Sequence, residues 1–388
     1  MSASVAGAAS TLEPQPPAPD GAGRELRFRV VRREAVDDRE IARLLAAITE
    51  SFGSWPSVDP GVPPAEHLRW KMASPAGDLA AIVGEIGEEL ACCQVCVSQR
   101  VRIAGEVVSR VRSADFAVRP AFRGRRAASE LSAVKTRVLG RPTLRLTETR
   151  HPAILHLTRK GGGVPLGNPV GALLLPLDAR RMGEQRGGGW RGVPGRILPA
   201  ALAVASRWRR RGRPLSPVAH ANGFSLRRIA RFDQSFAAFC EDACRAFDVA
   251  VERTPDYLDW RFCDPRAGSW CVDAVVEDGA VAGYVAWRVV DGRGFIGDLL
   301  VLPDRLAAVG ALVDAAVAGA AAEGAASVLC WLPVRHPYRR ALGERGFLGR
   351  AARVTHLFRP ESLSAQAAAL LAASATRIHL TLGDSDFL

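Results

Sequence analysis

The stretch Leu68-Arg69-Trp70-Lys71-Met72 occurs a second time, in changed form, as Leu258-Asp259-Trp260-Arg261-Phe262. Two further motifs recur in the same order: Asp115-x-x-Val118-x-Pro120 returns as Asp298-x-x-Val301-x-Pro303, and Arg150-His151-Pro152 returns as Arg335-His336-Pro337. The matched positions lie between 183 and 190 residues apart. This period is too long for a solenoid repeat, and it predicts two copies of one domain.

Both copies show the same predicted order of elements. Each begins with an alternating strand and an amphipathic helix that an aspartate caps, Asp37 in the first copy and Asp233 in the second. A hairpin, the Asp-x-x-Val-x-Pro strand, a helix, another strand and a short helix follow. The predicted ranges after the first helix include 79–83, 90–101, 128–138 and 143–147 in the first copy, and 271–276, 280–289, 306–322 and 327–332 in the second. We therefore expect an α/β fold of two tandem domains, each with a mixed central sheet flanked by helices.

The composition favours a cytoplasmic protein with two ordinary cores. The chain has 388 residues, 48% of them hydrophobic, and no run of about 18 apolar residues that could span a membrane. Residues 1–24 lack the features of a signal peptide, so we expect a disordered tail. We place the first domain at 25–178, an Arg-rich linker at 179–215, and the second domain with a C-terminal extension at 216–388.

The net charge of +12, carried almost wholly by arginine, favours anionic partners, although a coding bias would also produce it. The segment from Arg180 to Arg213 holds ten arginines and one acidic residue, Glu184, around the apolar run 197–205. Two interpretations stay open: a helix on an anionic membrane surface, or a linker helix whose apolar side docks on one domain. We expect no specific nucleic-acid binding, because neither aromatic platforms nor a groove-reading motif accompanies the charge.

The eight cysteines show no framework spacing. Cys93-x-x-Cys96 has no second pair and no histidine pair near it, and it lies in a predicted strand. We therefore expect buried thiols in a reducing compartment and no metal site.

The segment from Ala114 to Ala128 is the sharpest local signal. A buried strand ends at Pro120, a basic loop with Gly124 follows, and a helix begins at once. Successive N–H groups at such a helix start, with the helix dipole and nearby arginines, form an anion site that suits a pyrophosphate. An arginine-rich turn without a ligand is the alternative.

This segment resembles the acyl-CoA loop of the GNAT superfamily of acetyltransferases, whose pattern is Arg/Gln-x-x-Gly-x-Gly/Ala after Val-x-Pro. Arg126 stands where the family has its first glycine. The two-copy plan, over residues 25–178 and 216–360, also resembles tandem GNAT proteins of bacteria. The positions that match the family pattern are Val118, Pro120, Arg123, Gly124 and Ala128.

The resemblance implies that the first copy binds acetyl-CoA as co-substrate. The pantetheine arm would enter where the strand of Asp115 to Val118 splays from the strand 143–147, and the diphosphate would lie on the amides of the loop. The implied cofactor-binding residues are Phe116, Ala117, Val118, Arg123, Gly124, Arg125, Arg126, Ala127 and Ala128.

The second copy has Asp304-Arg305-Leu306 in place of this loop. A carboxylate at that position would repel a diphosphate. We therefore expect the second copy to be degenerate and to supply an interface or one wall of the acceptor site.

Three residues are candidates for acid–base chemistry: Glu148, Asp115 and His151. Asp115 and His151 recur in the second copy, which favours structural roles, whereas Glu148 has no acidic counterpart near Pro333 and is our first choice for a base. Many GNAT enzymes use a tyrosine as the acid, and the matching position here is Leu157.

The tryptophan–cation pairs Trp70-Lys71 and Trp260-Arg261 are predicted to pack, with the cation reaching solvent.

The sequence thus predicts an acyl-CoA-dependent N-acyltransferase that moves an acetyl group from acetyl-CoA to a small-molecule or polymer amine, with the first copy catalytic. Two alternatives stay open. One is a non-catalytic protein that binds acyl-CoA or a metabolite. The other is an envelope or polysaccharide assembly protein that contacts an anionic membrane surface through Arg180 to Arg213.

Overall fold

The computed structural model describes residues 25–56, 60–124, 126–140, 142–150, 152–184, 193–210, 220–221, 224–350 and 354–385. The first half of the chain contains β1 (Leu26–Arg32), α1 (Asp38–Phe52), α2 (Pro64–Met72), β2 (Leu79–Ile86), β3 (Glu89–Ile103), β4 (Glu106–Val118), α3 (Ala127–Leu139), β5 (Leu146–Thr149), α4 (Pro152–Lys160), β6 (Val164–Pro165) and β7 (Val170–Pro176). Two helices follow it, α5 (Ala179–Glu184) and α6 (Val193–Arg210).

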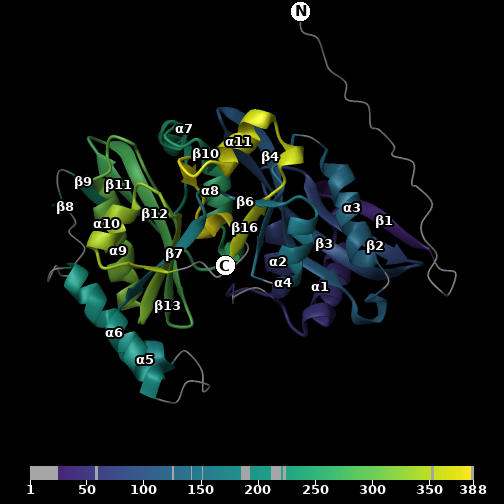
Figure 1. Ribbon diagram of the computed structural model, residues 1–388, viewed down its shortest axis with the longest axis horizontal. Helices are drawn as coiled ribbons and strands as arrows, with labels where there is room; N and C mark the ends of the chain where they lie inside the picture. Colours follow the sequence, from purple (N-terminus) through teal and green to yellow (C-terminus); the bar gives the residue numbers. More distant parts are fainter. Residues whose placement is uncertain are drawn as a thin grey trace, which may run out of the picture.

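The second half repeats this order, as predicted. It contains β8 (His220–Ala221), β9 (Phe224–Ile229), α7 (Ala237–Arg245), β10 (Val249–Val251), α8 (Pro255–Phe262), β11 (Cys271–Glu277), β12 (Ala280–Val290), β13 (Arg293–Val301), α9 (Ala308–Ala322), β14 (Ser327–Pro333), α10 (Arg339–Glu344), β15 (Leu348–Arg350), β16 (Thr355–Phe358), α11 (Ala365–Ala372) and β17 (Ile378–His379). The two halves lie side by side (Figure 1). No helix in the described part of the chain is both long and apolar enough to cross a membrane.

The halves exchange one strand each, β7 and β16. β7 of the first half lies between β14 and β15 of the second half and pairs antiparallel with both. In return, β16 of the second half lies between β5 and β6 of the first. In Figure 1, β7 stands among the green strands and the yellow β16 lies beside β6. Every residue of β7 is buried, which accounts for its continuous apolar sequence. The domain limits predicted at 178 and 216 therefore describe the order along the chain, while each sheet contains a strand from the other half.

The two larger sheets each hold most of one half. In the first sheet, β1, β2 and β3 follow one another, β4 pairs with β3, and β10 and β17 of the second half extend it. The second sheet has the order β15-β7-β14-β13-β12-β11-β9-β8. The short β5, β16 and β6 form a third sheet. Strands β10 and β17 therefore add a further sheet contact between the halves, beyond the exchanged strands.

Helices α2 and α8 bring the repeated tryptophans together. The rings of Trp70 and Trp260 stack with centroids 4.9 Å apart. The adjacent cations do not reach solvent as we predicted: Lys71 and Arg261 are both buried. The guanidinium of Arg261 lies over the Trp70 ring, 5.4 Å from its centroid. The prediction was wrong because each cation has buried partners: Lys71 lies against Asp115 and Trp55 of its own half, and Arg261 donates to the carbonyl of Gly383.

Local signals account for most element boundaries. The Asp37 carboxylate accepts a 2.7 Å hydrogen bond from the N–H of Glu40 and caps α1, as predicted. One strand is displaced: we predicted 143–147, and β5 occupies Leu146–Thr149. Thr143 makes only a single parallel bridge to Ser109 of β4, and the chain then pairs with β16 instead.

Candidate active site

Strand β4 and the segment that leads into β5 diverge in the first half. Beyond the bridge between Ser109 and Thr143, the described part of β4 pairs on one side only, with β3. Next to this open edge, β4 bulges: Val95 faces Ala114 and Cys93 faces Ala117, and Asp115 has a φ of 47°. A bulge redirects side chains and leaves backbone groups free to meet a ligand. This is the strand at which the sequence predicted an entering pantetheine arm.

The loop after β4 has a backbone suited to an anion. Gly124 has a φ of 82°, and Arg126, directly before the first residue of α3, has a φ of 62°. This left-handed conformation is the one that glycine adopts without strain. Arg126 therefore takes the backbone shape of the glycine it replaces. Its side chain and that of Arg123 are exposed at the start of a helix of 13 residues, whose dipole favours an anion.

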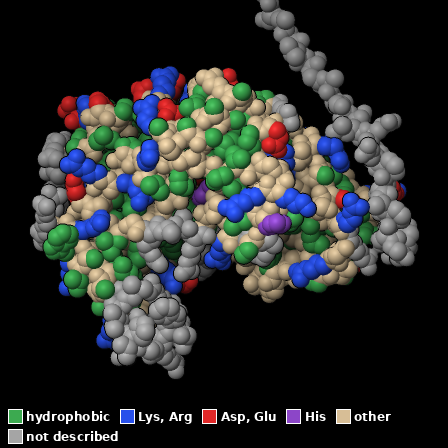
Figure 2. Space-filling view, in the orientation of Figure 1, with side chains coloured by type: hydrophobic (Ala, Val, Ile, Leu, Met, Phe, Trp, Pro, Cys, Tyr) green, Lys and Arg blue, Asp and Glu red, His purple; other side chains and the backbone are tan. Residues whose placement is uncertain are grey.

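The other predicted cofactor-binding residues that the structure describes lie on β4 and at the start of α3. Ala117 and Ala127 are buried, Ala128 is exposed, and Phe116 keeps 38% of its surface accessible. The carbonyl of Val118 accepts a hydrogen bond from Nε of Arg123 at 3.3 Å. Arg125 lies outside the described residues. Figure 2 shows basic side chains spread over both halves of the visible face.

Glu148 on β5 is held in a buried polar cluster. Its Oε1 accepts a 2.8 Å hydrogen bond from Nη2 of Arg110, and both side chains are almost fully buried. Its cross-strand partner in the register is His356 of β16, whose Nε2 lies 3.6 Å from the same oxygen. Burial lowers the pKa of His356, and Arg110 lowers it further, while Glu148 partly opposes them. The imidazole is therefore neutral at pH 7.

His356 was missed by the sequence prediction. It lies 208 positions after Glu148, and it reaches the first half only because β16 is exchanged. The one signal that could have indicated it is the strand register, which the sequence does not specify.

A further cation, Lys135, lies on the α3 side of the same strands. It is half-buried, and its ammonium donates a hydrogen bond to Oγ of Ser113 on β4. Burial, together with the charges of Arg145 and Arg110, lowers the pKa of Lys135 to about 8. Positive charge therefore surrounds the place where β4 and β5 diverge.

Asp115, another predicted site residue, is held in an ion pair. Both carboxylate oxygens of Asp115 accept hydrogen bonds from Nζ of Lys71, at 2.8 and 3.1 Å, and the pair is buried. This ion pair favours the structural role that the recurrence of Asp115 suggested. Leu157 on α4 is 64% exposed. His151 lies outside the described residues.

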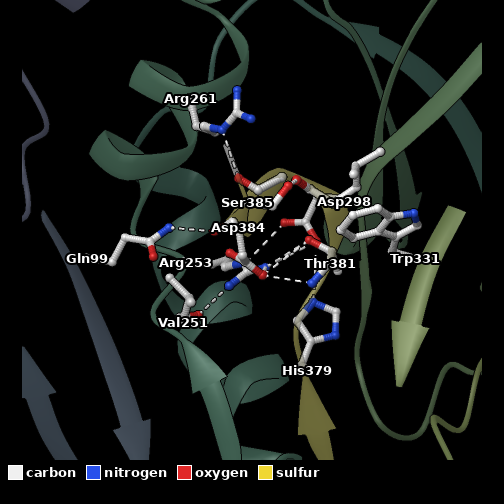
Figure 3. A network of polar contacts seen from close by, with 12 residues as sticks. Gln99, Val251, Arg253, Arg261, Asp298, Trp331, His379, Thr381, Asp384 and Ser385 are labelled. Carbon is white, nitrogen blue, oxygen red and sulfur yellow. Dashed lines mark hydrogen bonds and ion pairs between the residues drawn. The ribbon is translucent and has the colours of Figure 1, made fainter. Parts of the chain in front are cut away.

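The counterpart of Asp115 in the second half, Asp298, joins a buried network (Figure 3). Nε of Arg253 donates to Asp298 at 3.0 Å, and Nη2 of Arg253 donates to Asp384 at 2.7 Å. The hydroxyl of Tyr284 also donates to Asp298, at 2.7 Å. Although burial alone would raise the pKa of Asp298, the charge of Arg253 holds it well below the usual range. The network ties the C-terminal segment to β13.

The equivalent strand edge in the second half is occupied by a side chain of that half. Tyr338 lies with its hydroxyl against Val301, the counterpart of Val118. It accepts a hydrogen bond from the Val301 N–H at 3.0 Å and donates one to the Val301 carbonyl at 3.1 Å. These are the strand groups that an extended ligand arm would otherwise meet.

The second half also differs from the first in the loop after β13 and at the positions that correspond to Glu148 and His356. Arg305 is neutralised by Asp304 and Glu277. Pro333, which lies 185 positions after Glu148, faces Val170 of β7. The second half thus has an apolar pair where the first has Glu148 and His356.

The sequence matches no protein-family model, and no curated protein matches it either. Solved structures, in contrast, match over most of the chain. A probable N-acyltransferase from Enterococcus faecalis V583 has a TM-score of 0.56 at 12% identity, over 85% of this chain and 72% of that one. Saccharomyces cerevisiae N-myristoyltransferase with bound myristoyl-CoA and inhibitors has a TM-score of 0.56 at 12% identity, over 89% and 81%. A GCN5-related N-acetyltransferase from Kribbella flavida has a TM-score of 0.51 at 15% identity, over 87% and 72%.

These matches define the class of fold, that of the GCN5-related N-acetyltransferase (GNAT) type. The resemblance stated from the acyl-CoA loop is confirmed at the level of the fold. The same matches extend over both halves, because each covers more than four fifths of the chain.

Proposed function

We propose that this protein is an acyl-CoA-dependent N-acyltransferase that transfers an acetyl group from acetyl-CoA to an amine acceptor, and that the first half carries the reaction. The contrast between the edge of β4 in the first half and the edge of β13 in the second half is the observation that supports this most. In the first half β4 keeps an open edge beside a basic loop, whereas Tyr338 occupies the matching edge in the second half. The structural neighbours, which include a probable N-acyltransferase and an N-myristoyltransferase with bound myristoyl-CoA, support the acyl-CoA class.

The residues that would hold the co-substrate are those of the β4 edge and its loop. The N–H groups of Gly124, Arg126 and Ala127 and the cations of Arg123 and Arg126 suit a diphosphate. When bound, acetyl-CoA supplies the thioester whose acyl carbon an amine attacks. The left-handed backbone of Arg126, which glycine adopts without strain, supports a loop of this kind at the position where the family has its first glycine.

Proton transfer is assigned to the cluster at β5. An amine acceptor arrives as an ammonium ion and must lose a proton before it can attack. Neutral His356 accepts this proton, and Glu148, hydrogen-bonded to Arg110, stabilises the imidazolium that results. Glu148 thus acts through His356, and the second half contributes a catalytic side chain to the first. The thiol proton comes from solvent, because Leu157 stands at the tyrosine position.

Calorimetric titration with acetyl-CoA tests the binding part of this proposal. The wild-type chain is expected to bind one acetyl-CoA, and an Arg123→Ala/Arg126→Ala variant to lose it. Arg305→Ala, at the corresponding loop of the second half, is the matched control and should bind like the wild type. Absence of binding to the wild type at about 1 mM acetyl-CoA, the upper end of usual Michaelis constants, would overturn the proposal.

An amine-acceptor screen tests the chemistry. Transfer of label from acetyl-CoA to amino sugars, polyamines or peptides, lost in His356→Gln, is the expected result. One-site binding without transfer to any acceptor class would favour a non-catalytic acyl-CoA-binding protein instead.

A further inference from the structure

Helix α6 has one face that docks on the protein. Leu202 packs beside Leu174 and Met182, on β7 and α5. Ser206, one turn further on, is buried, and both Ser206 and Arg210 lie directly against Gly346. These positions, four residues apart, form one stripe of the helix. The stripe fixes α6 to the second half and determines which side of the helix is turned outward.

The opposite face of α6 is an exposed apolar stripe. Val204 is 67% exposed and Trp208 is 81% exposed, more than any other large hydrophobic side chain in the described part of the chain. Ala201 and Ala205 are exposed beside them. The spacing 201, 204, 205, 208 is that of one helix face. Leaving a tryptophan in water is costly, so such a stripe marks a surface that binds something.

Arginines border this stripe on both sides. At 3.6 residues per turn, Arg207 and Arg209 fall on opposite flanks of the face formed by Val204 and Trp208, and the flank of Arg209 adjoins the docked side, where its guanidinium lies near Gly343 of α10. Both side chains are exposed. The chain contains no Asp or Glu between Glu184 and Asp233, so no nearby acidic residue in the sequence offsets them. Figure 1 shows α5 and α6 extending beyond the lower edge of the second half.

We propose that α6 lies on the surface of an anionic membrane, with Val204 and Trp208 entering the headgroup region and Arg207 and Arg209 beside lipid phosphates and carboxylates. Tryptophan prefers this interface because its ring is apolar and its N–H is polar. The alternation of an apolar stripe with basic flanks is the pattern of helices that lie in the membrane surface. A nucleic acid would pair with the arginines but gives no reason for exposed Val204. The proposal is independent of the proposed enzymatic function, since α6 contributes no residue to the candidate active site.

The test is sedimentation of the full chain with phosphatidylcholine vesicles that contain about 30% phosphatidylserine, compared with vesicles of phosphatidylcholine alone. We expect binding to the anionic vesicles, weakened by salt. Arg207→Gln/Arg209→Gln should reduce partitioning about 25-fold, because each arginine near an anionic surface contributes about a fivefold factor. Val204→Ala/Trp208→Ala should reduce it by at least about tenfold through the lost apolar area.

Matched controls separate this surface from general charge and general hydrophobicity. Arg27→Gln/Arg245→Gln removes two exposed arginines elsewhere, and Phe52→Ala removes an exposed aromatic side chain on α1. Both controls should bind vesicles like the wild type, and every variant should keep the wild-type melting temperature. Equal losses in control and α6 variants would overturn the proposal. So would binding of RNA, or association between copies of the chain, that depends on Trp208 while vesicle binding is absent.

Discussion

Trp70 and Trp260 form a reciprocal pair across the boundary between the halves. Nε1 of Trp70 donates a 2.7 Å hydrogen bond to the carbonyl of Trp260, and Nε1 of Trp260 donates a 3.0 Å bond to the carbonyl of Trp70. Each residue thus plays the same part toward the other, as in the interface of a symmetric dimer. The repeated motif in the sequence therefore encodes the contact by which the two copies recognise one another.

This pair predicts strongly coupled losses of stability. Trp70→Ala or Trp260→Ala should each lower the free energy of unfolding by about 3–5 kcal/mol, because a large buried ring is removed. The double variant should lose less than the sum, by at least about 0.5 kcal/mol, since each single change already destroys the shared stack and both hydrogen bonds. Urea unfolding of the four proteins measures this coupling. Strictly additive losses would show that the rings act independently.

Strand exchange predicts that neither half folds alone. Residues 25–184 lack β16, and β7 in that fragment lacks β14 and β15. Each fragment therefore exposes unpaired strand edges and the indole of the tryptophan pair. We expect fragments 25–184 and 193–388 to form a folded complex when produced together, and each to lack a cooperative melting transition by itself. A monomeric, cooperatively melting single fragment would contradict this.

The sequence predicted the elements well and their partners poorly. The hairpins, the caps and the order of strands follow from local alternation and from residues such as Asp37, which act within one or two turns. The exchange of β7 and β16 has no local signal, because both copies carry an equivalent strand and either pairing buries it. The environment of Lys71 was predicted wrongly because Asp115, which pairs with it, lies 44 residues away in the chain.

In the candidate site, too, the local features could be predicted from the sequence and the contacts between distant residues could not. Its loop was readable from the sequence because the strand, glycine and helix start are contiguous from Ala114 to Ala128. Glu148 could be selected only by the absence of a counterpart near Pro333, and its neighbours Arg110 and His356 come from two other strands. Contacts of that kind depend on register, and register is set by tertiary packing.

The hydrogen bonds of Tyr338 to Val301 at the edge of β13 predict a loss of stability when its hydroxyl is removed. Tyr338→Phe would leave the buried N–H and carbonyl of Val301 without their present partner. We expect a loss of about 1–3 kcal/mol in the free energy of unfolding. If the first half alone binds acetyl-CoA, the calorimetric stoichiometry should stay at one in this variant. Appearance of a second acetyl-CoA site would show that the tyrosine hydroxyl is the only barrier there.

The strained backbone of Arg126 predicts that a glycine at this position stabilises the protein. Its φ of 62° is strained for a residue with a side chain, so Arg126→Gly should raise the free energy of unfolding by about 1 kcal/mol. Arg126→Ala removes the same charge and keeps the strain, which makes it the matched control. Denaturant titration compares the two. A glycine variant no more stable than the alanine variant would mean that the loop does not retain this backbone in solution.

His356 predicts how rate and stability depend on pH. Its pKa in the folded protein lies below the ordinary value of about 6.5, because the side chain is buried and Arg110 is near. Above about pH 6.5 the folded and unfolded chains both hold it neutral, and its contribution to stability is constant. As the pH falls below that value the unfolded chain binds the proton first, so stability decreases by up to about 1.4 kcal/mol per pH unit until the folded pKa is reached. Burial lowers the pKa of His336 in the same direction, so His336 adds to this acid-side loss.

The catalytic role requires a second effect that a structural histidine would not produce. If neutral His356 takes the proton of the amine, kcat/KM should fall as the pH drops through its folded pKa, and His356→Gln should abolish that limb while lowering the rate about 100- to 10,000-fold. Glu148→Gln should lower the pKa of His356 further, because the carboxylate that favours the imidazolium is lost, and should move the limb to lower pH. Initial rates at fixed acetyl-CoA across pH, with urea unfolding of the same variants, separate the two effects. A limb that persists in His356→Gln, at unchanged stability, would assign the proton transfer to another group.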